Sequence, residues 1–367
     1  MTELNLLTFD LQGQGCFTKI ADRVNRIKKL KIEEKGLKGG RQIAKNMNAR
    51  ERFTAYLEGR PVDRPPRIES KFADDTVELW RAEGYLDKRP PEEFFDLDRH
   101  ESVPIQVRKF DAPEDPRTIW PSPETWYDAA DPRRFPENWS VWCKEAAKRD
   151  HLISFEPWPE GMFQILGIRN YRSFVPVILF LMDEPERVRY ILDFYTEYLE
   201  ELIDRVCAGV KPDYAILYEP IASNSGLVIS PEMARRFLEP RYRRICARLE
   251  RHGIHRRFAW SCGHILPLIP LWMDCGINGM FIDQACAAGV DYLQVRREYG
   301  PDLALQGGID NRTLRQGEQA MIRELQRKVP PLLESGRYIP GLDDTVRVDI
   351  PFEMFANYRE WLLGMVE

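Results

Sequence analysis

The sequence lacks several features that would point to a particular class of protein. It has no cysteine pair at CxxC spacing, no GxGxxG motif and no uncharged apolar run of about 18 residues that could span a membrane. Its seven cysteines are scattered, which argues against a secreted disulfide framework and predicts reduced thiols in a cytoplasmic protein. The formal net charge of −5 supplies no basic face for nucleic acid. We therefore expect a soluble globular protein whose partners include neither a membrane nor nucleic acid.

The first 46 residues differ in composition from the rest. After a short LLTFDL run they become polar and rich in lysine, as in KIADRVNRIKKLKIEEKGLKGGRQIAK. Such a segment buries little apolar surface, so residues 1–46 are expected to be a disordered basic extension, or to precede a true start at Met47. The folded domain should cover 47–367 and open with a helix, because Asn48 and Glu51 are spaced as a capping box.

The first half of the chain is irregular. The prolines of PVDRPPR (61–67) favour an extended backbone, so a first strand should follow them. From about 70 to 180 the sequence is rich in Pro, Trp and acidic residues, and IWPSPETWY and FEPWPEG are its most turn-like stretches. We interpret this region as long insertions covering a barrel mouth, with a small independent domain as the alternative.

From about 185 onward, helix and strand patterns alternate regularly. Helices are expected at 186–207, 231–252, 266–275, 291–299, 313–334 and 351–366. Strands are expected at 213–219, 256–262, 276–283, 302–308 and 337–341. Strands joined through helices must run parallel, so the pattern predicts a (β/α)8 TIM barrel, a single domain with long insertions in its first half. An open doubly wound sheet is the alternative, although no nucleotide-binding glycine motif supports it.

Reactive side chains follow each expected strand of this half. They are Glu219, Cys262, His264, Asp283, Asp310, Asp343 and Asp344. Each one alone is typical of a helix cap, but catalytic groups of a parallel barrel lie at the C-terminal strand ends, so together they predict a site. The candidate catalytic residues are Glu219, His264, Asp283 and Asp343. The candidate substrate-binding residues are Arg67, Tyr218, Trp260 and Asp310.

Four stretches, in order, resemble the uroporphyrinogen decarboxylase superfamily over roughly 48–366. They are ARERFTAYLEGRPVDRPP, ISPEMARRFLEPRYRRI, GGIDNRTL and RYIPGLDDTVRVDIPFEMFANYREWL. The resemblance implies a barrel and either a porphyrinogen decarboxylase or a zinc-dependent methyltransferase that works with a corrinoid protein. True decarboxylases carry an MRQAGR stretch after the RPP segment, whereas this sequence reads RIESKFADD. Its acidic Asp74 and Asp75 would repel a substrate with many carboxylates, so the chain resembles the methyltransferase branch more closely.

The resemblance also implies a zinc site, because that branch places His-x-Cys after one strand and a further Cys near the closing strand. Here the positions read Trp260-Ser261-Cys262 and Leu342, so two of the three ligands are missing. His264 could substitute, with Glu219 or Asp343 completing a mixed zinc site beside Cys262. The alternative is that Cys262 is a small wall residue and that His264 acts without metal.

The leading hypothesis is methyl transfer from a small ether or amine donor to a corrinoid protein, with a carboxylic acid protonating the leaving group. One alternative is decarboxylation of a tetrapyrrole or another acid, with Arg67 holding a carboxylate. The other is a non-catalytic barrel that binds a corrinoid or a tetrapyrrole. The oligomeric state stays open.

Overall fold

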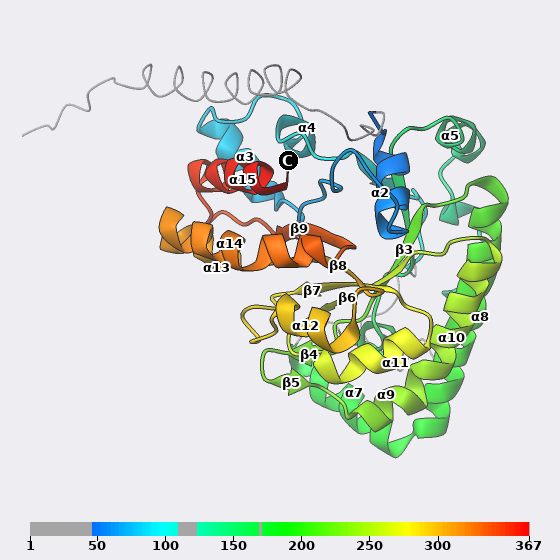
Figure 1. Ribbon diagram of the computed structural model, residues 1–367. Coiled ribbons are helices and arrows are strands. Elements are labelled where there is room, and N and C mark those ends of the chain that lie inside the picture. The colour runs from blue at the N-terminus through cyan, green and yellow to red at the C-terminus, as the bar shows by residue number, and fades with distance from the viewer. Residues whose placement is uncertain (1–45, 109–122, 169–170, 367) are drawn as a thin grey trace, which may run out of the picture. The chain divides into compact units, whose positions relative to one another are not determined.

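The computed structural model describes residues 46–108, 123–168 and 171–366 (Figure 1), so the extension expected over 1–46 lies outside them except for Asn46. The main sheet is parallel and curled, with the strand order β1-β2-β3-β6-β7-β8-β9. Its strands are His100–Ser102 (β1), Leu152–Trp158 (β2), Tyr214–Tyr218 (β3), Arg257–Cys262 (β6), Gly279–Asp283 (β7), Ala304–Ile309 (β8) and Tyr338–Leu342 (β9). A short antiparallel hairpin, Ala222–Ser223 (β4) with Gly226–Leu227 (β5), follows β3.

Helices connect the strands and pack around the outside of the sheet (Figure 1). The α-helices are Ala49–Leu57 (α2), Asp74–Ala82 (α3), Pro91–Phe94 (α4), Trp139–Ala146 (α5), Met162–Ile165 (α6), Tyr171–Asp183 (α7), Pro185–Gly209 (α8), Pro231–Phe237 (α9), Glu239–Arg251 (α10), Ile269–Asp274 (α11), Tyr292–Tyr299 (α12), Arg312–Gln316 (α13), Glu318–Glu334 (α14) and Phe352–Val366 (α15). The 3-10 turns are Pro123–Thr125 (η3), Pro132–Arg134 (η4) and Leu266–Leu268 (η5). Among the described residues, no helix combines the length and apolar character needed to cross a bilayer.

The sheet shows seven strands over the described residues, where eight were expected. The extended segment 66–73 lies between β1 and β9, the two edge strands of the sheet. It forms backbone hydrogen bonds with residues that adjoin each of these strands. The Asp98 amide donates to the Arg67 carbonyl (2.8 Å), and the Val346 amide donates to the Lys71 carbonyl (2.8 Å). Its only ladder contact in the described structure is an isolated parallel bridge between Phe72 and Val346. Closure into an eight-stranded barrel therefore stays a prediction.

The regular second half matches the sequence expectation, with two corrections to its helices. The expected helix 231–252 is divided into α9 and α10, because Pro240 in the first turn of α10 has no amide to continue the α9 hydrogen-bond ladder. The expected helix 313–334 is divided into α13 and α14 at Gly317, whose φ of +100° lies outside the helical region. The capping box of Asn48 and Glu51 is confirmed at the start of α2.

The first half contains more regular structure than the sequence suggested. FEPWPEG was expected to form a turn, but Phe155 to Trp158 belong to strand β2. Pro157 is tolerated there because the register of β2 against β3 shifts between Phe155 and Trp158, so a ladder hydrogen bond from residue 157 is not required.

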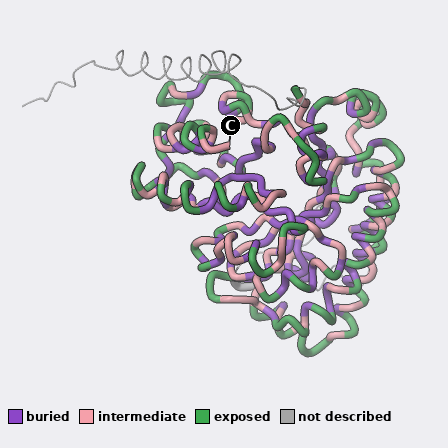
Figure 2. The backbone as a smooth tube through the Cα atoms, viewed as in Figure 1, coloured by how far each residue is buried: buried purple, intermediate pink, exposed green. Residues whose placement is uncertain are grey.

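The two faces of the curled sheet have different surroundings. The inner face begins with an apolar layer at the N-terminal end of the barrel, made of Phe53, Leu57, Ile68, Leu152, Tyr214, Phe258, Ala304 and Ile339. The outer face packs against the helices through Ala215, Leu217, Ala259, Met280, Ile282 and Leu305, which are all fully buried. In Figure 2 the strands accordingly form a buried centre surrounded by exposed helix surfaces. Because side chains alternate along a strand, this division determines which strand-end groups can face the mouth.

Candidate active site at the strand ends

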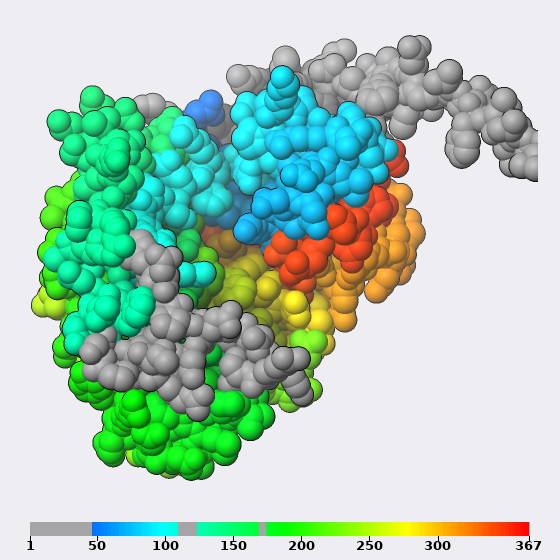
Figure 3. Space-filling model, turned by 180° about the vertical axis from the view of Figure 1, so that it is seen from behind, coloured from blue at the N-terminus to red at the C-terminus, as the bar shows by residue number. Residues whose placement is uncertain are grey.

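The inner-face side chains above the apolar layer are only partly buried. They are Ile216 and Tyr218 on β3, Trp260 and Cys262 on β6, Phe281 and Asp283 on β7, and Gln306 on β8. Pairing places Tyr218 opposite Trp260, and Cys262 opposite Asp283. Seen from behind, the surface is hollowed between first-half segments and the later segments in yellow and red (Figure 3). The inner face of the curled sheet is therefore accessible near its C-terminal strand ends, where aromatic rings and acidic groups line it.

Two adjoining pockets extend this opening toward β1 and β2. One holds about 390 Å³ between Tyr218, Trp260 and Gln164, and the other holds about 360 Å³ beside Ser102 and Glu156. The rings of Tyr218 and Trp260 lie 5.2 Å apart. The Ser102 hydroxyl donates to Glu156 Oε1 (3.1 Å), which holds that carboxylate at the edge of the opening. The combined space is large enough for a small organic substrate.

Asp283 has the most reactive arrangement among the inner-face groups. Burial, followed by the negative charges of Asp344 and Asp343 and a hydrogen bond to Asp344, raises the pKa of this carboxyl to about 7, while Arg347 acts against the shift. Asp344 Oδ1 lies 3.5 Å from the Arg347 guanidinium. The Asp283 carboxyl is therefore partly protonated near neutral pH.

Asp343 is buried and bonded to the backbone of two neighbouring loops. Its Oδ2 accepts from the Cys286 amide (2.9 Å) and its Oδ1 from the Asn311 amide (3.0 Å). Burial raises its pKa, although these two hydrogen bonds act against the shift. This geometry suits a group that fixes the loops after β7 and β8 next to Asp283.

Glu219 follows β3, but it points to the outer face of the sheet. Residues 215 and 217 face the helices, and Glu219 continues that alternation. Its carboxylate accepts from the Met162 amide (2.9 Å) and from the Tyr242 hydroxyl (2.7 Å), and the side chain is buried. Burial raises its pKa to about 7. The structure therefore separates Glu219 from the group at the mouth.

Two further predicted residues are held in ion pairs. Asp310 accepts from both Nε and Nη2 of Arg312 at 2.8 Å; burial alone would raise its pKa, but these bonds lower it. Arg67 is buried and pairs with Asp96, while its neighbour Ile68 belongs to the inner apolar layer, so Arg67 faces the other way. Neither side chain joins the group at the mouth.

The donor set for zinc does not fit. Cys262 is on the inner face, whereas Glu219 is on the outer face with both oxygens hydrogen bonded. Burial and the charge of Asp283 raise the pKa of the Cys262 thiol, and its Sγ donates to the Ala222 carbonyl (3.4 Å). His264 follows Gly263, with its amide bonded to the Ser223 carbonyl (2.9 Å). Within the described parts of the chain, no three His, Cys, Asp or Glu side chains gather as a metal would require.

The tandem glycines permit close packing at the end of β8, as the sequence predicted. Gly307 and Gly308 have φ of +85° and +80°. A Cβ atom would lie 2.6 Å from the Phe281 ring at Gly307 and 2.4 Å from the Tyr292 ring at Gly308. The first glycine thus allows Phe281 to stand in the mouth.

The candidate residues chosen from the sequence left out Gln306 and Glu156. Phe281 was expected only as a wall of the pocket beside Tyr218 and Trp260, and Asp344 only as a strand-end acid. The alternation of inner and outer residues would have found Gln306, since it shares the face of Ala304. Glu156 could not be found in this way, because it lies in a strand interrupted by a proline.

Comparisons with known proteins agree with this architecture. The family model described as uroporphyrinogen decarboxylase (URO-D) matches residues 168–361, more than half of the chain. The chain belongs to the uroporphyrinogen decarboxylase (URO-D) family. No match was found among curated proteins.

Two solved structures are similar to the chain. A methyltransferase from Methanosarcina mazei has a TM-score of 0.60 at 15% identity, covering 87% of this chain and 98% of that one. A structure from Listeria monocytogenes, assigned as a vitamin-B12 independent methionine synthase, has a TM-score of 0.39 at 13% identity, covering 83% of this chain and 96% of that one. The first similarity shows a shared fold.

Proposed function

We propose that this chain transfers a methyl group from a small methylated donor, an ether or an amine, to a corrinoid protein. The observation that carries the proposal is the Asp283 carboxyl, which lies on the inner face with Tyr218, Trp260 and Phe281 and whose pKa burial and the neighbouring acids raise to about 7. Membership of the URO-D family supports a barrel-mouth reaction, and the shared fold with a methyltransferase supports this branch.

The chain's own residues would bind the donor and protonate its leaving group. Tyr218, Trp260 and Phe281 would contact the apolar part of the donor, and their rings would exclude water around the methyl group. A cobalt(I) corrinoid on the partner protein would supply the nucleophile. As the carbon–oxygen bond of an ether breaks, the electron pair goes to oxygen, and the Asp283 carboxyl supplies the proton that makes the departing group an alcohol.

The charge of the mouth favours this reaction over decarboxylation of a polycarboxylate. Arg108 lines both pockets of the opening, where it lies among the acids Glu156 and Glu160. Arg67, which was expected to hold a carboxylate, pairs with Asp96 instead. An arginine accompanied by acids suits a small donor better than a substrate with many carboxylates.

The test is a transfer assay with purified protein, a reduced corrinoid protein and a panel of methylated ethers and amines. We expect methylated corrinoid to form with at least one donor. Asp283→Asn should abolish most of this transfer, whereas Asp349→Asn, an exposed acid paired with Arg315, should leave the rate unchanged. Conversion of uroporphyrinogen to a less carboxylated product, or no transfer from any donor, would overturn the proposal.

A further inference from the structure

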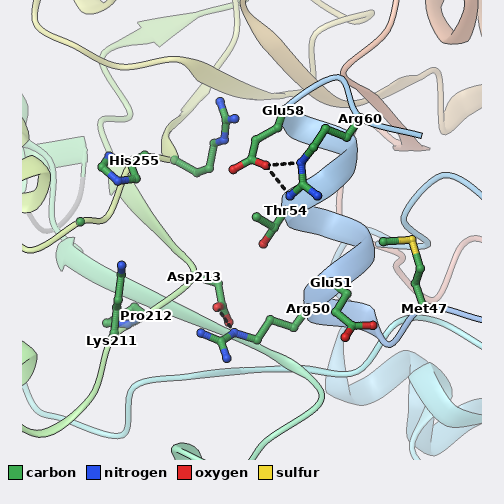
Figure 4. A pocket seen from close by; sticks show the side chains of 12 residues that line it. Met47, Arg50, Glu51, Thr54, Glu58, Arg60, Lys211, Pro212, Asp213 and His255 are labelled. Atoms are coloured by element: carbon green, nitrogen blue, oxygen red, sulfur yellow. Dashed lines mark hydrogen bonds and ion pairs between the residues drawn. The ribbon is translucent and has the colours of Figure 1, made fainter. Parts of the chain in front are cut away.

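A second cavity lies at the other end of the barrel. It holds about 620 Å³ between helix α2 and the turns that lead into β3 and β6. Its lining includes Arg50 and Thr54 on α2, Glu58 directly after α2, and Lys211 and His255 on the turns (Figure 4). Because the strands of the sheet are parallel, the N-terminal ends that border this cavity lie opposite the mouth with Asp283. The cavity is separate from the candidate active site.

Two of the three acids that line this cavity are paired with arginines. Asp213 pairs with Arg50 (2.7 Å) and with Arg149 (3.1 Å), and its Oδ2 accepts the Ile153 amide (2.9 Å). Glu58 pairs with Arg60, as the dashed lines in Figure 4 show, and Glu51 accepts the Asn48 amide in the capping box. Asp213 and Glu58 therefore have arginine partners of their own, whereas Glu51 keeps its charge.

Two cations of the lining have no such partner. Over the described residues, neither the Lys211 ammonium nor the Arg256 guanidinium makes a hydrogen bond or an ion pair with another side chain. Burial lowers the pKa of Arg256, the charge of Glu58 acts against this shift, and the neighbouring Arg337 and Arg257 lower the pKa by smaller amounts. Because burial outweighs the attraction of Glu58, a further anion at this guanidinium would be favourable.

The backbone holds both cations in place. The Arg256 carbonyl accepts the Ala215 amide (2.8 Å), which fixes Arg256 at the start of β6, and the Lys211 carbonyl accepts from Arg149 Nη2 (2.8 Å). Gly253, with φ of +73°, leaves room for the lysine, since a Cβ atom there would lie 2.7 Å from Lys211 Nζ. The backbone positions that carry the two positive groups are thus fixed, and Thr54 places a hydroxyl in the same lining.

We infer that this cavity is a binding site for the phosphate group of a small phosphorylated molecule. A guanidinium fork, an ammonium and a hydroxyl on separate walls can share the several oxygens of a phosphate. The lining has no Phe, Tyr or Trp, and its one imidazole, of His255, is bound to Glu250, so the phosphate itself would provide most of the recognition. The site lies away from the reacting groups, so its occupant would not be the methyl donor, and the inference does not depend on the proposed function.

The experiment is calorimetric titration of the full chain with pyrophosphate at constant ionic strength. We expect saturable binding that weakens at least tenfold in Lys211→Met and in Arg256→Gln. The matched control is Arg251→Gln, which removes one positive charge at an exposed position of α10 outside the cavity and should bind within twofold of the original protein. Equal weakening in all three variants would show a general charge effect and overturn the site.

Two further measurements distinguish the ligand class and the folding effect. Citrate, a small anion whose charges are carboxylates, should bind at least tenfold more weakly than pyrophosphate, and equal binding would overturn the assignment to phosphate. Without added anion, Arg256→Gln should unfold at a higher temperature than the original protein, because it removes an uncompensated charge. A lower unfolding temperature would mean that Arg256 already has a stabilising partner, which contradicts the inference.

Discussion

Glu219 and Asp283 occupy opposite faces of the same sheet and differ in almost everything except their pKa. Burial raises the pKa of each carboxyl to about 7. Glu219 lies among the outer helices, where the Met162 amide and the Tyr242 hydroxyl occupy both of its oxygens. Asp283 lies on the inner face near the C-terminal strand ends, where the charge of Asp344 helps to raise its pKa. A perturbed pKa therefore marks a buried group, and only the face of the strand shows whether a substrate can reach it.

The comparison is tested most severely by Asp283→Asn. If the inner carboxyl is the proton donor, methyl transfer should slow by about 10²–10⁴-fold, the usual contribution of a general acid. Stability should be unchanged or higher, because a carboxyl with a raised pKa is removed. Transfer rates and urea unfolding of the variant would measure both effects, and a variant that loses stability but keeps its rate would remove Asp283 from the mechanism.

Neighbouring residues on β3 offer a matched pair for the two faces. Leu217 is fully buried on the outer face, so Leu217→Ala should lower the free energy of unfolding by about 2–5 kcal/mol with the transfer chemistry retained. Tyr218→Phe, on the inner face, should change stability by less than about 1 kcal/mol but reduce affinity for the donor. Urea unfolding and donor titration would show the contrast. Equal stability losses would mean that the two faces are not distinguished as described.

Glu219 itself should affect stability more than catalysis. Because its pKa is higher in the folded chain than the usual 4.5, the folded state gains stability from the proton at low pH and loses it as pH rises through about 7. Glu219→Gln keeps the acceptor for Met162 and should stabilise the protein at pH 8 by on the order of 2 kcal/mol. Glu219→Ala should instead destabilise it, since two buried donors lose their acceptor. Thermal unfolding from pH 5 to 8 would check the difference, and a Gln variant inactive at full stability would restore Glu219 as a catalytic candidate.

The last prediction concerns the pH dependence of transfer. Asp283 donates only when protonated, so the rate should fall by about tenfold per pH unit above its pKa of about 7. The Asn variant should show no such decline in the same range. Rates measured from pH 5.5 to 9 would reveal it, and a rate that rises with pH would indicate a general base instead.

The second half of the chain was predictable because its helices and strands obey their periods over long stretches. Strands β3, β6, β7, β8 and β9 were each placed within three residues of their observed ends. The first half was harder to predict, because Pro157 occurs inside a strand and β1 has only three residues. A pattern of alternation cannot be recognised over so short a length.

The sequence predicted where in the fold the candidate site lies, but it predicted less well which residues form it. Selecting the residue after each strand found Asp283, but it also selected Glu219, which faces the other side. Tyr214 is on the inner face of β3, and alternate residues along a strand face the same side. Counting from Tyr214 would therefore have placed Glu219 on the outer face. The cavity beside Lys211 and Arg256 escaped the sequence analysis because the search covered only the C-terminal ends of the strands, and no motif marks two unpaired cations that meet only after folding.

The hydrogen bond from the Met162 amide to Glu219 also provides a way to observe motion near the mouth. Met162 begins α6, whose Gln164 lines the pocket beside Tyr218. An amide bonded to a buried carboxylate exchanges its hydrogen with solvent only when that contact opens. Slow deuterium uptake at this one amide would show that the start of α6 stays bonded to Glu219. Faster uptake in Glu219→Ala would measure how often this contact opens while the rest of the fold stays intact.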